Sequence, residues 1–310
     1  MTLSDELVSV IIPTYYRNDW LTDAIESVLD QTYEPTEIIV VDDSGEEFAK
    51  PVVEEYGVTY IAHKRNQGGN PARNTGIEAA NGAYIQLLDD DDRLLPTKID
   101  KQVALFESNL SVGVVYCGLQ QENGNMVFPN RENKGDVLAQ ALRISDLHPC
   151  QTGTMLFRGG LLRELYPLAS REAGDDLGLK IRAAAETEFD FIDEVLLTKG
   201  DSDRHRGAKV EFSDEILSIV REFDDLYDRF DPQVRRDALA AAYQSRGARL
   251  VEKSRWSPEA AICFAKALYY RDSLEPQLVG SFVSSMFGRW AYDMTRRVYH
   301  SMSREQTRFD

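Results

Sequence analysis

The stretch Ala83-Tyr84-Ile85-Gln86-Leu87-Leu88-Asp89-Asp90-Asp91-Asp92-Arg93-Leu94-Leu95-Pro96 is the part of the sequence that best defines the fold. It begins as an apolar, β-forming segment and ends in four consecutive carboxylates. A strand that stops there carries negative charge to the carboxyl edge of its sheet, where open α/β sheets bind ligands. Neighbouring carboxylates repel one another unless a cation lies among them, and a hard divalent ion is a common solution. The stretch therefore predicts a metal-assisted site, with a solvated acidic loop as the alternative.

The segments around this stretch alternate between short apolar runs and amphipathic runs. The alternation is typical of a mostly parallel sheet with helices on both faces. Asn70 as cap and Pro71 at the first helical position predict the start of one of these helices. We expect Asp42, Asp43 and the acidic run to lie at one edge of the sheet. Strands are predicted at Val8–Ile12 (ended by Pro13), Glu37–Val41, Val58–Ile61, Tyr84–Leu88, Val112–Tyr116, Gly153–Phe157 and Phe189–Leu197.

The last third of the chain has a different pattern. After Asp175-Asp176, which precede a predicted helix, and the strand at Phe189–Leu197, the sequence becomes all helical from about Phe212. Prolines mark several of the helix starts. We therefore expect an α/β domain at 1–210 and a C-terminal region of helical hairpins at 211–310. The helices of that region are predicted at 215–229, 232–252, 258–270 and 276–299.

Charge and cysteine usage exclude several classes of protein. The 310 residues carry a formal net charge of −17, which disfavours nucleic-acid binding because phosphates require positive charge. Cys117, Cys150 and Cys263 are too widely spaced for a disulfide framework or a Cys-based metal site. The polar start and the lack of a long apolar run in the sequence favour a cytoplasmic protein. An acidic chain that is poor in lysine also suits a high-salt cytoplasm.

At this point the sequence resembles a known family, the family 2 glycosyltransferases of the GT-A fold, in a prokaryotic and haloarchaeal form. The resemblance is close over about residues 7 to 110 and thinner to about residue 200. It implies an inverting, hexosyltransferase-type enzyme that takes a sugar from a nucleoside diphosphate donor with Mn²⁺ or Mg²⁺. The acceptor would be a hydroxyl of a glycan or lipid-linked molecule, as in cell-surface glycan or N-glycan assembly. The motifs that carry the resemblance are Val8–Tyr15, Glu37–Ser44, Asn66–Gly68 with Ala72–Gly76, and Gly82–Asp92.

The resemblance also assigns residues to the donor site. Pro13, Thr14 and Tyr15 match positions that line the nucleoside pocket. Asp43 matches the carboxylate that accepts a hydrogen bond from the base, with uracil as first choice and guanine as second. Asp42 is expected to fix the turn instead.

The acidic run supplies the family's DxD pattern. Asp91 matches the metal ligand, while Asp89 and Asp90 would lie by the ribose and the metal, with Asp89 as a further ligand. Arg73 would face the diphosphate or pair with Asp42. His205 lies where some relatives place a loop that closes on the pyrophosphate; it is either a functional residue near the metal or only solvated.

The remaining assignments concern the acceptor side and a loop. Asp176, with Asp175 before it, matches the general base that removes the acceptor proton; capping of a helix is the alternative. Asn66 and Gly68 either let the backbone approach the nucleotide or form a plain turn.

Other functions stay open from the sequence alone. They are transfer to a polyprenyl or dolichyl phosphate, a nucleotidyltransferase-like reaction, and a non-catalytic binding protein. Pro13-Thr14-Tyr15-Tyr16 stands where nucleotidyltransferases carry a Gly-rich basic signature, which disfavours that class. Apolar residues at helical spacing within 276–299 form an amphipathic face beside Arg289, Arg296 and Arg297. This face would pack on other helices or a second subunit, or lie on an anionic membrane. The oligomeric state is not predicted.

Overall fold

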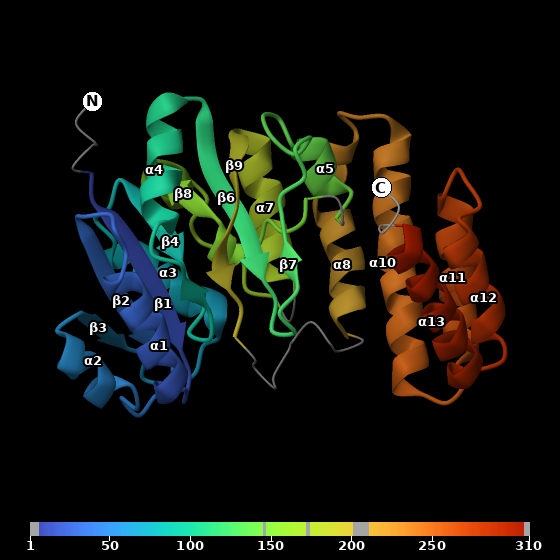
Figure 1. Cartoon of the computed structure of the whole chain (residues 1–310), viewed down its shortest axis with the longest axis horizontal. Coiled ribbons are helices and arrows are strands. Elements are labelled where there is room, and N and C mark those ends of the chain that lie inside the picture. Colours follow the sequence, from blue (N-terminus) through green and yellow to red (C-terminus); the bar gives the residue numbers. More distant parts are fainter. Residues whose placement is uncertain (1–5, 145–146, 172–173, 201–210, 307–310) are drawn as a thin grey trace. The chain divides into compact units, whose positions relative to one another are not determined.

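The computed structural model describes residues 6–144, 147–171, 174–200 and 211–306. The chain divides into two compact units, which are described separately. The α/β unit comprises Met1–Ala141, Asp146–Arg171 and Asp175–Arg204, and the helical unit comprises the rest. The helical unit thus takes in two short segments, Leu142–Ser145 and Glu172–Gly174, and its main part begins at His205, a few residues before the predicted boundary at 210. The elements of each unit are labelled in Figure 1.

Within the described part of the α/β unit, nine strands form one sheet (Figure 1). The strands β3, β2, β1 and β4 are parallel, as expected. The strand β8 then runs antiparallel to both β4 and β6, so the sheet is mixed rather than mostly parallel. In spatial order the strands are β3 (Thr59–Ala62), β2 (Thr36–Asp42), β1 (Val8–Thr14), β4 (Tyr84–Leu87), β8 (Leu156–Arg158), β6 (Val112–Gln120), β9 (Glu188–Thr198) and β5 (Arg93–Leu94), with β7 (Met126–Val127) paired to β6.

The strand β1 occupies the middle of the parallel part and directs its side chains to both faces. Val10 and Ile12 belong to the apolar core that α1 and α4 also line. Ile11 points to the other face, where α3 lies against the strand: a Cβ at Gly76 would stand 2.2 Å from Ile11 Cγ2. Only glycine permits this close approach. Pro13 lies inside the strand, paired with Val41, and does not end it as expected. This is possible because β4 pairs with β1 only as far as Ile11, beyond which no ladder bond toward β4 is lost.

The helices of the α/β unit follow the predicted alternation with small corrections. The helix α3 begins at Gly69, and Asn70 is not its cap because its side chain donates to the Ala169 carbonyl. The predicted strand Gly153–Phe157 is instead a 3₁₀ turn, Thr152–Thr154, followed by β8. The helices are α1 (Asn18–Leu29), α2 (Lys50–Tyr56), α3 (Gly69–Ala79), α4 (Lys98–Ser108), α5 (Leu138–Leu142), α6 (Gly159–Glu164) and α7 (Asp175–Glu186).

The described part of the helical unit contains α8 (Glu211–Glu222), α9 (Asp224–Tyr227), α10 (Pro232–Lys253), α11 (Pro258–Tyr270), α12 (Pro276–Ser285) and α13 (Arg289–Gln306). Its core contains Phe264, Leu278 and Tyr292. The single helix expected over 276–299 is wrong, because the chain turns at Gly288 with φ +89°. The helix expected over 215–229 is likewise divided into α8 and α9. Within the described residues, none of the helices combines the length and apolar character needed to cross a bilayer.

Candidate active site

The acidic run begins where β4 ends, at the carboxyl edge of the parallel strands. Leu88 N still donates to Ile11 O at 2.9 Å, so the chain leaves the sheet only at Asp89. Thr14, the last residue of β1, donates its hydroxyl to Asp90 Oδ2 at 2.9 Å. Two strand ends thus meet at Asp90. Its burial raises the pKa of this carboxyl to about 6, although Arg17 and the Thr14 hydroxyl act in the opposite direction.

Arg17 lies between β1 and α1 and binds two carboxylates of the run. Its Nη1 is 3.0 Å from Asp90 Oδ1 and 3.2 Å from Asp91 Oδ2. The negative charges of Asp90 and Asp91 raise the Arg17 pKa above its ordinary value, although burial lowers it. The sequence analysis assigned no role to Arg17. The signal that could have found it is a lone arginine just after the first strand, at the edge where the acidic run was expected.

Arg73 on α3 compensates another carboxylate of the run. Its Nη2 is 2.5 Å from Asp89 Oδ1, and its Nη1 donates to Asn70 Oδ1 at 2.8 Å. Its Nε is buried without a hydrogen-bond partner. The predicted alternative, pairing of Arg73 with Asp42, is therefore wrong.

Asp42 fixes the turn after β2, as the sequence analysis expected. It accepts hydrogen bonds from Ser44 N at 2.9 Å, Ala49 N at 2.8 Å and the Tyr60 hydroxyl at 2.8 Å. These partners leave Asp42 directed into the protein and away from Arg73.

The end of β9 brings two further residues to the acidic run. Gly200 N donates to Asp92 Oδ1 at 3.4 Å, and a Cβ at Gly200 would stand 1.8 Å from Asp91 O. Burial raises the pKa of Asp92 to about 8, and Lys199 opposes that rise. Neither Lys199 nor Gly200 was singled out from the sequence, because only the tertiary fold brings residues so far along the chain next to Asp91 and Asp92.

Asp43, at the end of β2, is held by the loop that precedes α3. It accepts hydrogen bonds from Gln67 N at 2.9 Å and Gly68 N at 2.7 Å, and it lies 2.7 Å from His63 Nδ1. A carboxylate offers about four lone-pair sites, so these partners use most of them. Asp43 therefore orders the loop, in which Gly68 has φ +101° and Asn66 is exposed.

Aromatic side chains lie beside the turn that follows β2. The rings of Tyr15 and Tyr16 meet edge to face at 4.7 Å, and Tyr16 contacts Phe48 at 5.0 Å between ring centroids. The Tyr16 hydroxyl donates to Ser44 O at 3.3 Å. These three rings are part-exposed and offer a surface for a planar ligand. The sequence analysis named only Tyr15, since loop residues carry no periodicity that would mark Tyr16 and Phe48.

Asp175 and Asp176 are the first two residues of α7. Asp175 Oδ1 accepts a hydrogen bond from Arg171 N at 3.0 Å. Burial lowers the pKa of Arg73, but the charges of Asp89, Asp175 and Asp176 raise it. The negative charge of Asp176 also contributes to the raised pKa of Lys199. The start of α7 therefore lies close enough to Arg73 and Lys199 to influence both cations electrostatically, whereas His205 lies outside the described residues.

The donor set determines what kind of metal site is possible here. In the described part of the chain, no three His, Cys, Asp or Glu side chains converge to hold an ion. Mg²⁺ is usually held by one or two carboxylates together with substrate phosphates and water, not by an all-protein cage. Asp91, whose side chain is 15% exposed, fits the first arrangement. A divalent ion is therefore compatible with these residues when a nucleotide supplies the other ligands.

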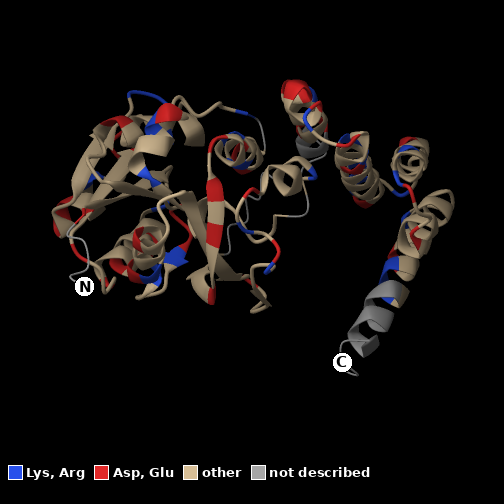
Figure 2. Cartoon of the chain, turned by 90° about the horizontal axis from the view of Figure 1, so that it is seen from above, with Lys and Arg blue, Asp and Glu red and all other residues tan. Residues whose placement is uncertain are grey.

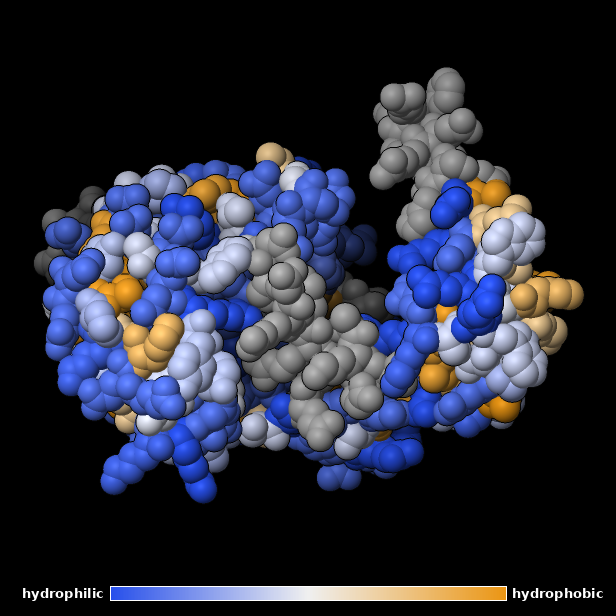
Figure 3. Space-filling model, turned by 90° about the horizontal axis from the view of Figure 1, so that it is seen from below, coloured by the Kyte–Doolittle hydropathy of each residue, from blue (hydrophilic) through white to orange (hydrophobic). Residues whose placement is uncertain are grey.

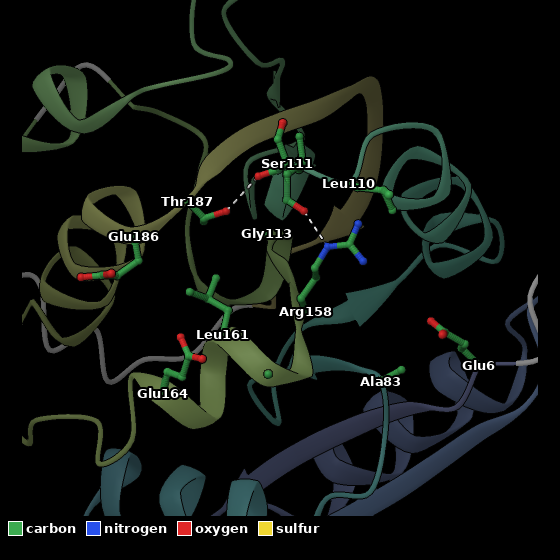
Figure 4. A pocket seen from close by; sticks show the side chains of 12 residues that line it. Glu6, Ala83, Leu110, Ser111, Gly113, Arg158, Leu161, Glu164, Glu186 and Thr187 are labelled. Atoms are coloured by element: carbon green, nitrogen blue, oxygen red, sulfur yellow. Dashed lines mark hydrogen bonds between the residues drawn. The ribbon is translucent and has the colours of Figure 1, made fainter.

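A cavity of about 410 Å³ lies at the opposite, amino edge of the sheet. Figure 4 shows Glu6, Glu164 and Glu186 around it, with Arg158 among them. The Arg158 guanidinium donates to main-chain carbonyls, including Val112 O at 2.8 Å. This cavity shares none of the predicted site residues.

A parallel half-sheet that ends in clustered carboxylates and cations defines an α/β protein with a polar site at its carboxyl edge. The family model described as glycosyl transferase family 2 matches residues 9–165, just over half of the chain. The chain therefore belongs to glycosyl transferase family 2. This confirms the family that the sequence motifs indicated.

Curated relatives agree with this assignment. A glycosyltransferase of Rickettsia typhi is 30% identical over 239 residues, which cover 72% of this chain and 71% of that protein. One from Rickettsia conorii is 40% identical over 204 residues, which cover 63% of this chain but only 33% of that protein. For three Rickettsia relatives, the matched part spans only 16 to 33% of the relative's length.

Two solved structures share the fold. The structure of S. aureus TarS 1–349 in complex with UDP-GlcNAc matches with a TM-score of 0.65 at 16% identity, covering 95% of this chain and 91% of that one. The mannosyltransferase PcManGT of Pyrobaculum calidifontis, in complex with GDP-Man and Mn²⁺, matches with a TM-score of 0.58 at 18% identity, covering 93% and 83%. The expected GT-A fold with a helical C-terminal region is thereby confirmed.

Proposed function

We propose that this chain transfers a hexosyl group from a nucleoside diphosphate sugar, with UDP sugars as first choice, to a hydroxyl of a glycan or lipid-linked acceptor. The observation that carries the proposal is the convergence of Asp89, Asp90 and Asp91 with Arg17 and Arg73 at the carboxyl edge of β1 and β4. A site that already holds both signs of charge suits a diphosphate bound with a divalent ion. The nucleotide sugars bound to TarS and PcManGT support the donor class.

The nucleoside would bind over the ends of β1 and β2. Pro13, Thr14 and Tyr15 line this place, and the part-exposed Tyr15 ring offers a face on which a base can stack. Asp43 fixes the Asn66–Gly68 loop, whose backbone can then approach the nucleotide closely because Gly68 carries no side chain. Any contact of Asp43 with the base adds to this ordering role.

Metal assistance is part of the proposal. Asp91 would hold Mn²⁺ or Mg²⁺. Asp89 and Asp90 would contact the other ligands of the ion or its bound water molecules. The ion, when bound, neutralises the diphosphate as charge develops on the leaving group. Arg73 binds Asp89 and orients its carboxylate.

Asp176 is proposed as the general base. The acceptor oxygen forms a bond to the anomeric carbon while the bond from that carbon to the β-phosphate oxygen breaks, and Asp176 takes the acceptor proton. Attack opposite the leaving group inverts the anomeric centre. A polyprenyl phosphate acceptor, the second candidate, is already ionised and would not need this base.

The proposal is tested by incubating the protein with UDP and GDP sugars and Mn²⁺, with and without hydroxyl and polyprenyl phosphate acceptors, and measuring nucleotide release. We expect one donor to stand out, with release that depends on an acceptor and stops with chelator. A thermal-shift screen of the same donors is the companion measurement, because ligands that bind the native state raise its apparent stability. The absence of both release and thermal shift for every donor would refute the proposal.

We further propose that the helical unit makes peripheral contact with an anionic membrane. The observation that favours this is a set of exposed apolar residues around the α12–α13 turn, where Phe287 and Trp290 are each 76% exposed. Trp256 lies beside the turn and donates from Nε1 to Met286 O at 3.0 Å. Figure 3 shows hydrophobic residues interspersed with hydrophilic ones on the surface of this unit. Aromatic residues of this kind favour the membrane interface.

Flotation with anionic liposomes tests this contact. Full-length protein should co-float at low salt and less so at high salt. Replacing Phe287 and Trp290 with Ser should abolish co-flotation, whereas the same changes at Tyr269 and Leu274, exposed elsewhere on the unit, should not. Failure of the full-length protein to co-float at any salt would exclude the contact.

A further inference from the structure

Resting on the proposed function, we infer that Arg17 is a built-in counter-cation that competes with the divalent ion for Asp91. In the nucleotide-free protein Arg17 occupies the place where the ion would bind. The donor diphosphate then draws the guanidinium away and brings the ion to Asp91. Metal binding therefore depends on the donor through this side chain of the protein, in addition to the ligands that the phosphates supply.

The geometry shows why a cation is needed before the ion arrives. The side chain of Asp90 is only 7% exposed and that of Asp91 is 15% exposed. A buried carboxylate is costly unless it is paired, and neighbouring carboxylates in a row add repulsion. Arg17 Nη1 lies within 3.2 Å of an oxygen of each. One guanidinium thus stabilises both carboxylates without a metal.

Of the two arginines that bind the acidic run, Arg17 is the one that can leave more easily. Its side chain is 26% exposed, whereas that of Arg73 is 8% exposed and is held by Asn70 as well as Asp89. Arg17 is the N-cap residue of α1, outside the helix, and makes no side-chain cap. Its side chain can turn without breaking a helix, and both carboxylate contacts use the same nitrogen. The guanidinium keeps further donors in a planar fork that matches phosphate oxygens.

The charges make the two cations mutually exclusive at Asp91. A divalent ion at Asp91 would lie close to the guanidinium, and like charges repel one another strongly in a partly buried site. A diphosphate removes the conflict, because its oxygens bind both cations at once. By linkage, the ion and the nucleotide must then raise each other's affinity by the same factor.

The test measures Mn²⁺ binding by electron paramagnetic resonance of free Mn²⁺, with and without UDP, and needs no turnover. Wild type should bind Mn²⁺ weakly alone and much more tightly with UDP. Arg17→Gln should tighten UDP-free Mn²⁺ binding by about tenfold, which corresponds to ~1.4 kcal/mol. It should therefore reduce the ratio of the Mn²⁺ affinity with UDP to the Mn²⁺ affinity without UDP. Arg17→Lys keeps the charge and should behave like wild type.

Arg93→Gln is the matched control. Arg93 follows the acidic run directly, but it pairs with Asp23 at 3.2 Å on the exposed surface. Removing this cation changes net charge by the same amount and should leave Mn²⁺ binding unchanged. If it tightened binding as much as Arg17→Gln does, the effect would be general electrostatics and the inference would be wrong.

The outcomes separate this inference from the proposed function. If wild type binds Mn²⁺ with UDP and Arg17→Gln shows no gain in UDP-free binding, only the role of Arg17 is overturned. If no form binds Mn²⁺ even with UDP, the metal-dependent function fails as well. Circular dichroism verifies that Arg17→Gln folds. If it does not, equal Mn²⁺ affinity of wild type with and without UDP would still overturn the inference.

Discussion

The two edges of the sheet hold their arginines in different ways. At the carboxyl edge Arg17 and Arg73 bind the carboxylates of the acidic run. At the amino edge the Arg158 guanidinium is 2.8 Å from both Val112 O and Phe106 O, and it also stacks on the Phe106 ring. Both edges are rich in acidic residues, and Figure 2 shows acidic and basic positions interspersed over the α/β unit. Acidic content alone therefore does not distinguish the two edges.

The difference lies in what each cation would leave behind if it moved. If Arg158 moved, it would leave buried carbonyls without partners, which is costly, so its contacts are structural. If Arg17 moved, the carboxylates it left could be compensated by a metal ion and the guanidinium by phosphate. A cation that binds carboxylates can exchange them for other partners such as phosphate, whereas a cation that binds buried main-chain carbonyls cannot. The following predictions test this distinction, beginning with the largest expected effect.

Asp91→Asn should nearly abolish sugar transfer while the fold is kept. The amide has the same shape but no charge for a divalent ion, whose stabilisation of the leaving group is worth several kcal/mol. Turnover should fall by ~10³–10⁴-fold, since each 1.36 kcal/mol is a factor of ten. The measurement is nucleotide release at saturating Mn²⁺ and donor. Near wild-type turnover that persists with chelator would show that Asp91 binds no catalytic metal.

Asp176→Asn should lower turnover by ~10²–10⁴-fold with donor affinity kept, because the amide cannot accept the acceptor proton. Glu186→Gln is the matched control: Glu186 is at the other end of the same helix, α7, and lines the amino-edge cavity. It should leave turnover unchanged. The assignment of the base would be wrong if Asp176→Asn kept full activity with a neutral hydroxyl acceptor. A small effect with a polyprenyl phosphate would instead identify that acceptor class.

The sequence allowed the parallel strands and the acidic edge to be predicted because their signals are local. Buried parallel strands are continuous apolar runs, and Asp42, Asp43 and the acidic run directly follow such runs. The cations were harder to assign. Arg73 was expected either to face the diphosphate or to pair with Asp42, and it pairs with Asp89 instead of Asp42, because the choice of carboxylate depends on side-chain packing that spacing does not encode.

The missed features share one cause, which is tertiary contact between distant segments. Lys199 and Gly200 reach the acidic run only because β9 ends beside it. The break between α12 and α13 is similar: Gly288 lies where a Cβ would stand 2.6 Å from Arg255 O. The apolar spacing continued through that turn, so periodicity alone predicted one helix. The roles of the individual site residues stay predictions.

Lys98 gives a third test of this distinction. Like Arg158, this buried cation binds neutral oxygen atoms and not carboxylates. Its Nζ donates to Gln102 Oε1 at 2.7 Å and to Gln86 Oε1. Burial lowers its pKa to about 8 from the ordinary 10.5. Between these values the unfolded chain holds a proton that the folded chain has lost, so stability rises with pH through this window. Below about pH 8 both states are protonated and the full cost of burying the charge remains.

Lys98→Met should remove this pH dependence. The free energy of unfolding of wild type should rise, relative to the variant, by about 3 kcal/mol between pH 8 and 10.5, since one pKa unit is 1.36 kcal/mol. The measurement is urea denaturation followed by Trp20 fluorescence, with Trp256 and Trp290 replaced by Phe in both proteins, so that the signal comes from the α/β unit. Parallel pH curves for the two proteins would contradict the assignment of a depressed pKa to Lys98.

The smallest effect is expected at the amino edge. Glu164→Gln removes a carboxylate from the cavity of Figure 4, where Arg158 is engaged by main-chain carbonyls rather than by this side chain. Mn²⁺ affinity and turnover should both stay within about twofold of wild type, because surface charges at a distance are screened. The nucleotide-release assay used for Asp91→Asn and the Mn²⁺-binding assay used for Arg17→Gln make the comparison direct. A loss of Mn²⁺ binding in Glu164→Gln would show that the two edges are coupled, and that the way an arginine is bound does not mark the site.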